Sequence, residues 1–298
     1  MREDEIRRSP PRTIDESQRD QYFEQGYLHL PGFLSAEDLA PLKQATDELL
    51  DRSRDADSSD PAYDLGPNHT ADSLDVRRIR AAVDQHAAYW AIAADSIVTD
   101  LAADLVGPNV KFHSAKLNFK RGGNTIRWHQ DIQAWPHTNY SPVTVGIYLE
   151  DVGEDDGPLQ VVPGSHNGPL FDQYPGGRWT GYIAELDLAK VATSQARNLT
   201  GSAGTVFALN CRVVHGSPPN DGTGVRPCLL NVYSSADAFT YTSAPTPTSK
   251  TGTIVRGSPA RWAHVDPRPC RLPPDWALEG YGSIYSAQAG EDRTKLSK

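Results

Sequence analysis

The first third of the chain repeats hydrophobic residues every three or four positions, the spacing of one face of a helix. This pattern predicts helices over about 13–26, 35–53 and 83–107, the first of them opening on a capping box that starts at Thr13. Residues 1–12 are charged and broken by proline, and we expect them to be disordered. The chain therefore begins with a helical part, which ends at about residue 107.

A polar stretch, 54–75, interrupts this helical part. It is rich in Asp, Ser, Pro, Asn and Gly, which indicates a loop. Loops of this length in compact domains are usually functional or disordered. We expect it to be either a mobile loop or a segment at the mouth of a pocket.

Beyond Asn109 the hydrophobic period changes from helical to two. Residues 143–149 place Val, Val, Ile and Leu at every second position, the pattern of a strand with one buried face. Because helices come first and strands afterwards, the pattern predicts a mainly β fold with flanking helices, in which the sheet is antiparallel. The predicted strands, separated by turn residues, are 110–120, 125–131, 143–149, 159–162, 204–214 and 227–234.

Composition narrows the class of protein. A chain of 298 residues with 38% hydrophobic content is long enough for one sizeable core. The formal net charge is −9 and basic residues form no runs, which argues against nucleic acid or an anionic membrane as a partner. We find no signal peptide or membrane span in the sequence, and we predict a cytoplasmic protein. The three cysteines are odd in number and widely spaced, as expected for reduced thiols.

His129 and Asp131 form the first candidate for a metal site. Two residues apart on an extended segment, they direct an imidazole and a carboxylate to the same side. Two histidines and one carboxylate make up the facial triad of non-haem Fe(II) oxygenases, so a second histidine is required. A later His215, followed by Arg226, has the required order.

The same spacing occurs a second time, at His264 and Asp266. Composition alone gives about one such pair by chance, so the pair itself decides nothing. No histidine follows His264, whereas His215 follows Asp131. The first pair is therefore the stronger candidate.

Several further segments strengthen this interpretation. Trp135 lies four residues after Asp131, and Ser217 lies two after His215. With the segments 25–34 and 157–166, these motifs resemble the phytanoyl-CoA dioxygenase family of Fe(II)/2-oxoglutarate-dependent oxygenases, a group that includes ectoine hydroxylase. The resemblance covers roughly residues 15 to 235.

The resemblance implies a double-stranded β-helix, a jelly-roll, cupin-like barrel that holds its metal inside. The barrel would occupy about 109–236 within a single domain of 13–298. Residues 167–199 would be an insertion between core strands and are our candidate lid. The irregular segment 237–298 contains aromatic residues, and we expect it to wrap back over the barrel.

The resemblance also implies roles for individual residues. His129, Asp131 and His215 would bind Fe(II). Arg226 would grip the distal carboxylate of 2-oxoglutarate, because a planar guanidinium gives a bidentate contact. Ser217 would hydrogen-bond the same carboxylate, unless it is a plain turn residue. Other candidates for the cosubstrate pocket are Trp135, which could instead be a core aromatic, and Lys116 and Asn118.

The expected reaction uses dioxygen and 2-oxoglutarate to hydroxylate an unactivated C–H bond, with succinate and CO2 as co-products. Related halogenases have a small residue in place of the carboxylate ligand, so Asp131 favours hydroxylation, or desaturation or ring formation as variants of it. We expect a small-molecule metabolite as substrate, and the oligomeric state stays open. Candidate residues of the substrate pocket are Arg121, Arg178, Trp179 and Tyr182.

Two rival classes remain at this stage. One is a cupin-like metal enzyme that does not use 2-oxoglutarate, and the other is a non-catalytic ligand-binding relative. Arg226 and Ser217 argue against the first, and the intact set of three ligands argues against the second.

Overall fold

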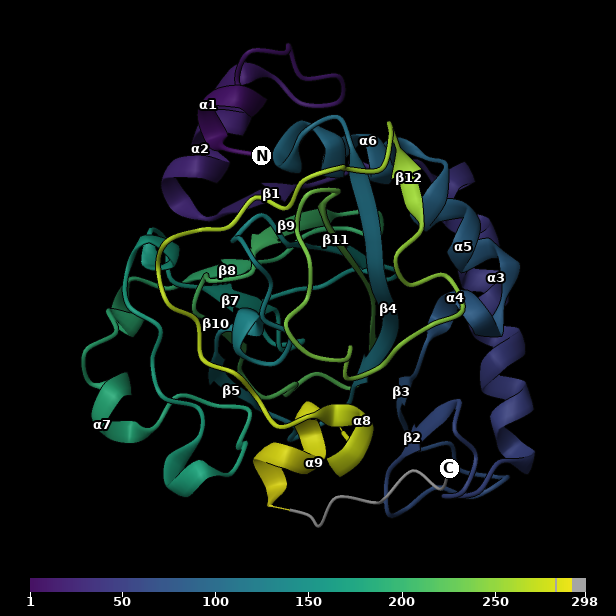
Figure 1. Ribbon diagram of the computed structural model, residues 1–298. Coiled ribbons are helices and arrows are strands. Elements are labelled where there is room, and N and C mark those ends of the chain that lie inside the picture. Colours follow the sequence, from purple (N-terminus) through teal and green to yellow (C-terminus); the bar gives the residue numbers. More distant parts are fainter. Residues whose placement is uncertain (282, 291–298) are drawn as a thin grey trace.

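A computed structural model describes residues 1–281 and 283–290 (Figure 1). Within these residues the helices are α1 (Glu3–Ile6), α2 (Glu16–Gln25), α3 (Ala36–Arg52), α4 (Ala82–Gln85), α5 (Ala87–Ala94), α6 (Ile97–Val106), α7 (Glu185–Leu188), α8 (Trp276–Glu279) and α9 (Ile284–Ala289). The strands are β1 (Tyr27–Leu30), β2 (Tyr63–Leu65), β3 (Val76–Ile79), β4 (Val110–Lys120), β5 (Ile126–His129), β6 (Val143–Tyr148), β7 (Leu159–Val161), β8 (Arg197–Leu199), β9 (Val206–Asn210), β10 (His215–Ser217), β11 (Arg226–Ser235) and β12 (Ile254–Arg256).

The strands form two antiparallel sheets. In the described part of the chain the larger sheet has the order β1-β9-β6-β11-β4-β3-β2, with β12 also paired to β4. The smaller sheet has the order β5-β10-β7-β8. Helices α3 to α6 lie together beside the larger sheet, and the smaller sheet lies on its other side (Figure 1). This arrangement confirms the predicted mainly β jelly-roll barrel with flanking helices.

The central strands of the larger sheet have two different faces. On β4, β6 and β11, odd-numbered side chains such as Leu117, Ile147 and Leu229 pack against the helices in the main hydrophobic core. Side chains at even positions, among them Lys116 and Thr144, line a cavity inside the barrel. We expected one buried face on residues 143–149, but all of β6 is buried, because its second face lines the interior of the barrel.

The helical part differs from the prediction at its start. The N-cap of α2 is Asp15, whose carboxylate accepts from the amide of Gln18, and not Thr13. The Thr13 hydroxyl and amide instead donate to Asp104 on α6, which ties the entry of α2 to that helix. Residues 1–12, expected to be disordered, contain α1, and Ile6 is buried.

The polar stretch 54–75 is also more ordered than its composition suggests. It contains β2, which pairs with β3, and β3 in turn pairs with β4 at the edge of the larger sheet. Backbone hydrogen bonds of a sheet edge can form without a hydrophobic run, so composition alone missed both strands. No residue of 54–75 contributes to the cavity lining described below.

The last described helices of the C-terminal segment lie against the barrel. Trp276 on α8 and Tyr285 on α9 are buried, and both helices lie together near the lower end of β4 and β5 (Figure 1). The indole nitrogen of Trp276 donates a hydrogen bond of 2.7 Å to the carbonyl of Ala134. Trp262, by contrast, is 86% exposed. Helices α8 and α9 therefore make the buried contacts between the C-terminal wrap and the barrel.

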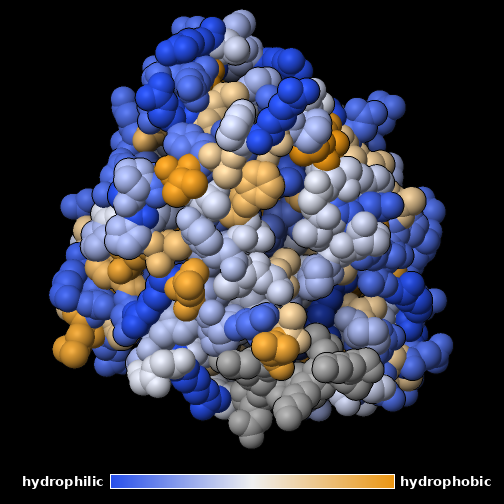
Figure 2. All heavy atoms as spheres, viewed as in Figure 1, coloured by the Kyte–Doolittle hydropathy of each residue, from blue (hydrophilic) through white to orange (hydrophobic). Residues whose placement is uncertain are grey.

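On the face viewed in Figure 2, hydrophilic residues predominate and hydrophobic ones form small, separate patches. Among the described helices, none combines the length and the hydrophobicity that crossing a membrane requires.

Candidate metal and cosubstrate site

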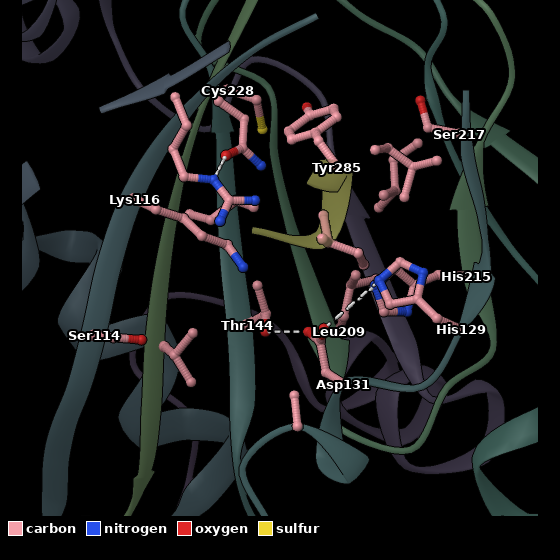
Figure 3. Close-up of a pocket in the computed structure, with 18 of the residues that line it drawn as sticks. Ser114, Lys116, His129, Asp131, Thr144, Leu209, His215, Ser217, Cys228 and Tyr285 are labelled. Atoms are coloured by element: carbon pink, nitrogen blue, oxygen red, sulfur yellow. Dashed lines mark hydrogen bonds and ion pairs between the residues drawn. The ribbon is translucent and has the colours of Figure 1, made fainter. Parts of the chain in front are cut away.

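Three side chains from the two predicted motifs converge inside the barrel. His129 ends β5, Asp131 follows in a 3-10 turn, and His215 begins β10. The Nε2 atoms of His129 and His215 lie 3.7 and 3.8 Å from Asp131 Oδ1. One ligand atom from each residue lies within 4.8 Å of the other two, a separation that one metal ion can span. Figure 3 shows the two imidazoles side by side, facing the carboxylate.

Backbone contacts fix which ring nitrogen faces the centre of the site. His129 Nδ1 lies 2.9 Å from the carbonyl of Arg127, and His215 Nδ1 lies 3.0 Å from that of Val213. A carbonyl only accepts, so each Nδ1 carries the hydrogen and each Nε2 presents its lone pair toward Asp131. Metal-binding histidines are typically oriented by such a contact.

The protonation states also suit a metal. Burial, and then the neighbouring His215, lower the pKa of His129 to about 3, which keeps this imidazole neutral. Burial acts to raise the pKa of Asp131, but His215, Lys116 and other neighbours outweigh it and lower that pKa. Thr144 donates to Asp131 Oδ2 at 3.0 Å (Figure 3). The result is a neutral His129, a His215 whose Nε2 faces the site, and one supported carboxylate, which together match the donor set of the Fe(II) facial triad.

Gln130, between the two first ligands, holds this segment in place. Its buried side-chain amide donates to the carbonyls of Pro169 and Arg212, and its oxygen accepts from the amide of Phe171. These hydrogen bonds of the Gln130 side chain hold the segment between His129 and Asp131 in place. This explains why a polar residue stands between His129 and Asp131.

The second His-x-Asp pair is not a metal site. Asp266 forms an ion pair of 2.7 Å with Arg268, and His264 contributes its backbone to a contact with Asp237. Within 1–281 and 283–290, His129, Asp131 and His215 make up the group of three with metal-binding geometry.

A cationic cluster occupies another part of the same interior. Arg226 is buried, its Nε has no hydrogen-bond partner in the part of the chain that the structure describes, and its guanidinium carbon lies 5.5 Å from the centre of the Tyr148 ring. Lys120, opposite Arg226 on β4, donates to Ser217 Oγ at 2.7 Å. Ser217 Oγ in turn donates to the carbonyl of Gly157 at 2.8 Å. A buried guanidinium with a free donor is prepared for an anion.

One cavity reaches from the metal ligands to Arg226 and Ser217, whereas Lys120 contacts Ser217 and is not among the lining residues. Of the residues predicted from the sequence, the ones that line it are His129, Asp131, His215, Lys116, Asn118, Trp135, Trp179, Ser217 and Arg226. Three predicted pocket residues are not among its lining: Arg178 is exposed, the Arg127 guanidinium covers the Tyr182 ring, and Arg121 lies beyond the end of β4.

The insertion 167–199 packs on the metal-bearing segment. The Tyr174 hydroxyl donates a hydrogen bond of 2.6 Å to the carbonyl of Gln133. Trp179 lines the cavity, and its indole nitrogen is buried without a hydrogen-bond partner among the described residues. Part of this insertion thus contributes to the lining of the cavity, and its role as a lid stays a prediction.

Sequence reasoning missed several lining residues. Arg78 on β3 was overlooked because the strand is short and polar, although the pattern Val-Arg-Arg-Ile resembles an edge strand. Thr144 lay unnoticed among the hydrophobic residues of β6. Tyr281 and Tyr285 were expected to pack on the barrel, but nothing in their spacing placed them at the cavity.

The chain matches the family model described as phytanoyl-CoA dioxygenase (PhyH) over residues 22–228, more than half of its length. The protein belongs to the PhyH family. It is 29% identical over 226 residues to a probable alpha-ketoglutarate-dependent hypophosphite dioxygenase of Stutzerimonas stutzeri, covering 74% of this chain and 79% of the relative. It is 28% identical over 238 residues to L-proline trans-4-hydroxylase of Streptomyces griseoviridis, covering 72% and 84%.

Solved structures agree with the sequence comparisons. The crystal structure of EctD from S. alaskensis with 2-oxoglutarate and 5-hydroxyectoine superposes on this PhyH-family protein with a TM-score of 0.64 at 25% identity. The alignment covers 96% of this chain and 89% of EctD. With the three converging ligands, these findings identify a 2-oxoglutarate-dependent non-haem iron dioxygenase. They do not fit a cupin-like enzyme without 2-oxoglutarate or a non-catalytic relative.

Proposed function

We propose that this PhyH-family protein hydroxylates an unactivated C–H bond of a small metabolite. The observation that carries the proposal is that one cavity contains both the three metal-binding side chains and a buried arginine with a free donor. A single metal site without such an anion-binding residue would fit many metal enzymes. The combination fits a dicarboxylate cosubstrate with one end at the metal and the other at Arg226.

In this proposal His129, Asp131 and His215 hold Fe(II). When bound, Fe(II) with 2-oxoglutarate and dioxygen supplies oxidation of a C–H bond, with succinate and CO2 as co-products. The carbonyls of Arg127 and Val213 hold both imidazoles with Nε2 toward the centre of the site. Thr144 restrains the carboxylate of Asp131, so three ligand atoms are positioned before the metal arrives.

Arg226 would bind the distal carboxylate of 2-oxoglutarate, helped by Ser217 and Lys120. The Ser217 hydroxyl has one hydrogen, and that hydrogen points to the carbonyl of Gly157. To donate to the cosubstrate, Ser217 would have to turn away from Gly157. Lys120 Nζ donates to the backbone oxygen and to Oγ of Ser217, so its ammonium form would add a positive charge beside Arg226. Asn118 and Trp135 line the same cavity and fit the role predicted for them.

Two segments, the insertion and the C-terminal wrap, would exclude water from the cavity. Trp179 comes from the insertion, and Tyr281 and Tyr285 come from the C-terminal wrap. Burial raises the pKa values of both tyrosines, which places their hydroxyls in a poorly hydrated environment. A dry cavity protects an oxidising site from side reactions with solvent.

Two finer points belong to the same proposal. The relatives are named for hypophosphite and L-proline, both small molecules, which supports a small metabolite here. Cys211, Cys228 and Cys270 are free thiols, which supports a reducing compartment such as the cytoplasm.

The test is oxygen-dependent formation of succinate from 2-oxoglutarate by iron-loaded protein. His215→Ala should abolish succinate formation, since one of three ligands is lost. The matched control is His264→Ala, which removes the histidine of the other His-x-Asp pair and should leave succinate formation unchanged. Equal loss in the two variants, or succinate formation that persists in His215→Ala, would contradict the proposal.

A further inference from the structure

Two positive side chains in the cavity are not needed for iron or 2-oxoglutarate. Arg78 on β3 and Lys116 on β4 both line the cavity, and Arg78 is only 1% exposed. They come from neighbouring strands of the larger sheet, in which Arg78 pairs in register with Asn118. Figure 3 shows Lys116 pointing into the cavity from the side opposite to His129 and His215.

Neither cation forms an ion pair with a described carboxylate, although Lys116 acts on Asp131 from a longer distance. Within residues 1–281 and 283–290, no carboxylate oxygen lies within 4.0 Å of either charged group, and Lys116 makes no hydrogen bond. Asp64, the cross-strand partner of Arg78, is buried, but it forms no ion pair within that distance in the described residues. Arg78 is buried and Lys116 is half-buried at the cavity. Charges withdrawn from solvent are normally paired, so a missing partner indicates a ligand.

Arg78 keeps a donor free for such a ligand. Its Nε donates to Asn118 Oδ1 at 2.9 Å, which fixes the plane of the guanidinium. Its Nη2 is buried and has no hydrogen-bond partner among the described residues, although the Tyr281 hydroxyl also contacts the guanidinium and the Tyr285 ring centre lies 5.5 Å from the guanidinium carbon. An arginine whose plane is held by Asn118 and whose Nη2 keeps its hydrogens free is arranged for an acceptor.

Charge balance points to the substrate and away from the cosubstrate. The two charges of Fe(II) and the one of Arg226 already balance Asp131 and both carboxylates of 2-oxoglutarate, and the ammonium form of Lys120 would only add to the positive side. Arg78 and Lys116 remain in excess. Lys116 also lies opposite Leu230 on β11, four positions along that strand from Arg226, and therefore belongs to a different part of the cavity. From the sequence we expected Lys116 to bind 2-oxoglutarate. The charge balance and its position opposite Leu230 favour a contact with the substrate instead.

We propose that Arg78 and Lys116 form an anion-binding subsite, so that the substrate of this enzyme carries a carboxylate, sulfonate or phosphonate group. The inference rests on the proposed function, since it concerns the substrate of that same site. Burial, and then Arg78, lower the pKa of Lys116 to about 8, and a bound anion would restore its charged form. Apolar lining residues such as Leu209 and Trp179 would contact the uncharged body of the substrate.

The test is a binding screen on the Fe(II) complex saturated with 2-oxoglutarate, without oxygen. The probes are small carboxylates, sulfonates and phosphonates, each paired with its neutral amide or ester. Binding is measured by calorimetry, while the visible absorption of the iron–cosubstrate complex is monitored. Persistence of that absorption shows that the acid has not displaced 2-oxoglutarate. If the iron–cosubstrate absorption is already absent before any probe is added, the proposed function fails, and this outcome is distinct from a failure of the acids to bind.

We expect the acids to bind. Their neutral partners should bind at least about tenfold more weakly, because a hydrogen bond between two charged groups stabilises a complex more than one to a neutral group. Lys116→Met and Arg78→Met should weaken acid binding by about tenfold or more, and Lys116→Arg should retain it. Arg178→Met, which removes an exposed arginine of the insertion, is the matched control and should change nothing.

Three results would overturn the proposal. The first is that no acid binds the complex at millimolar concentration. The second is that neutral partners bind as well as the acids. The third is that Lys116→Met, which removes a charge without adding bulk, binds the acids as tightly as the unmodified protein. Lys116→Met keeps the test decisive even where Arg78→Met fails to fold through loss of the Asn118 contact.

Discussion

His129 and His215 face each other directly across the antiparallel strands β5 and β10, with their ring centres 4.1 Å apart. This register brings together two histidines that are far apart in the sequence. Because side chains alternate across a strand, a slip of one residue would turn one imidazole out of the barrel. The metal site thus depends on the pairing of two short strands.

Gly216 allows this pairing. A Cβ on Gly216 would lie 2.9 Å from the backbone oxygen of Ile126, so Gly216→Ala should push β10 away from β5. We expect a loss of stability of about 1–3 kcal/mol and weaker Fe(II) binding, measured by urea unfolding and a competitive iron titration. Gly224→Ala meets no atom within 4 Å and is the matched control. Iron binding that is unchanged in Gly216→Ala would show that the site tolerates displacement of β10.

Arg226 should matter for 2-oxoglutarate and little for iron. Arg226→Met removes the guanidinium and keeps the aliphatic part, and we expect roughly 10- to 100-fold weaker 2-oxoglutarate binding, the effect of losing hydrogen bonds to a charged group. Fe(II) binding should change by less than about threefold, because the ligands are untouched. Arg121→Met, outside the cavity lining, serves as the control. Equal losses of iron and 2-oxoglutarate would count against the role of Arg226.

Lys120 should make 2-oxoglutarate binding depend on pH. Burial, and then the neighbouring Arg226, lower the pKa of Lys120 to about 7. A carboxylate bound beside it favours the ammonium form, so binding takes up a proton once the pH exceeds that value. Affinity should be highest below about pH 7 and fall above it by at most about tenfold per pH unit. In Lys120→Met the fall of 2-oxoglutarate affinity above pH 7 should disappear. If the affinity of this variant falls with pH as steeply as that of the unmodified protein, another group causes the fall.

Trp276 should anchor the C-terminal wrap. Its indole is buried, donates to Ala134 next to the metal-bearing turn, and packs on Trp179 and Tyr281. Trp276→Ala should cost about 3–5 kcal/mol of local packing and make the residues after 262 accessible to protease. Trp262→Ala, at an exposed position, should stay within about 0.5 kcal/mol by urea unfolding. Similar proteolysis of the two variants would mean that other contacts hold the segment.

The sequence predicted those parts of the fold that have a strong hydrophobic period. Strands β4, β6 and β11 were found because alternate residues such as Leu117, Ile147 and Leu229 pack in the core. Strand β10 was missed because it has three residues, one of them Gly216, and owes its conformation to its two neighbours. Tertiary pairing, and not local preference, forms such strands.

The site shows the same division. The metal-binding residues and Arg226 could be predicted because their order along the chain resembles a known family. Arg78 could not, because its function as a pocket residue depends on β3 lying next to β4. Arg178 was chosen for its place in the insertion, yet a polar residue of a loop has no periodic pattern that would tell a pocket from solvent.

The most direct test of the account is an anaerobic titration of metal-free protein, first with Fe(II) and then with 2-oxoglutarate, followed by visible absorption. We predict a charge-transfer band that appears only after 2-oxoglutarate is added, is absent in His215→Ala, and disappears with formation of succinate when oxygen is admitted. Folded, iron-loaded protein that shows no band at saturating 2-oxoglutarate would contradict the assignment of this cavity to Fe(II) and 2-oxoglutarate.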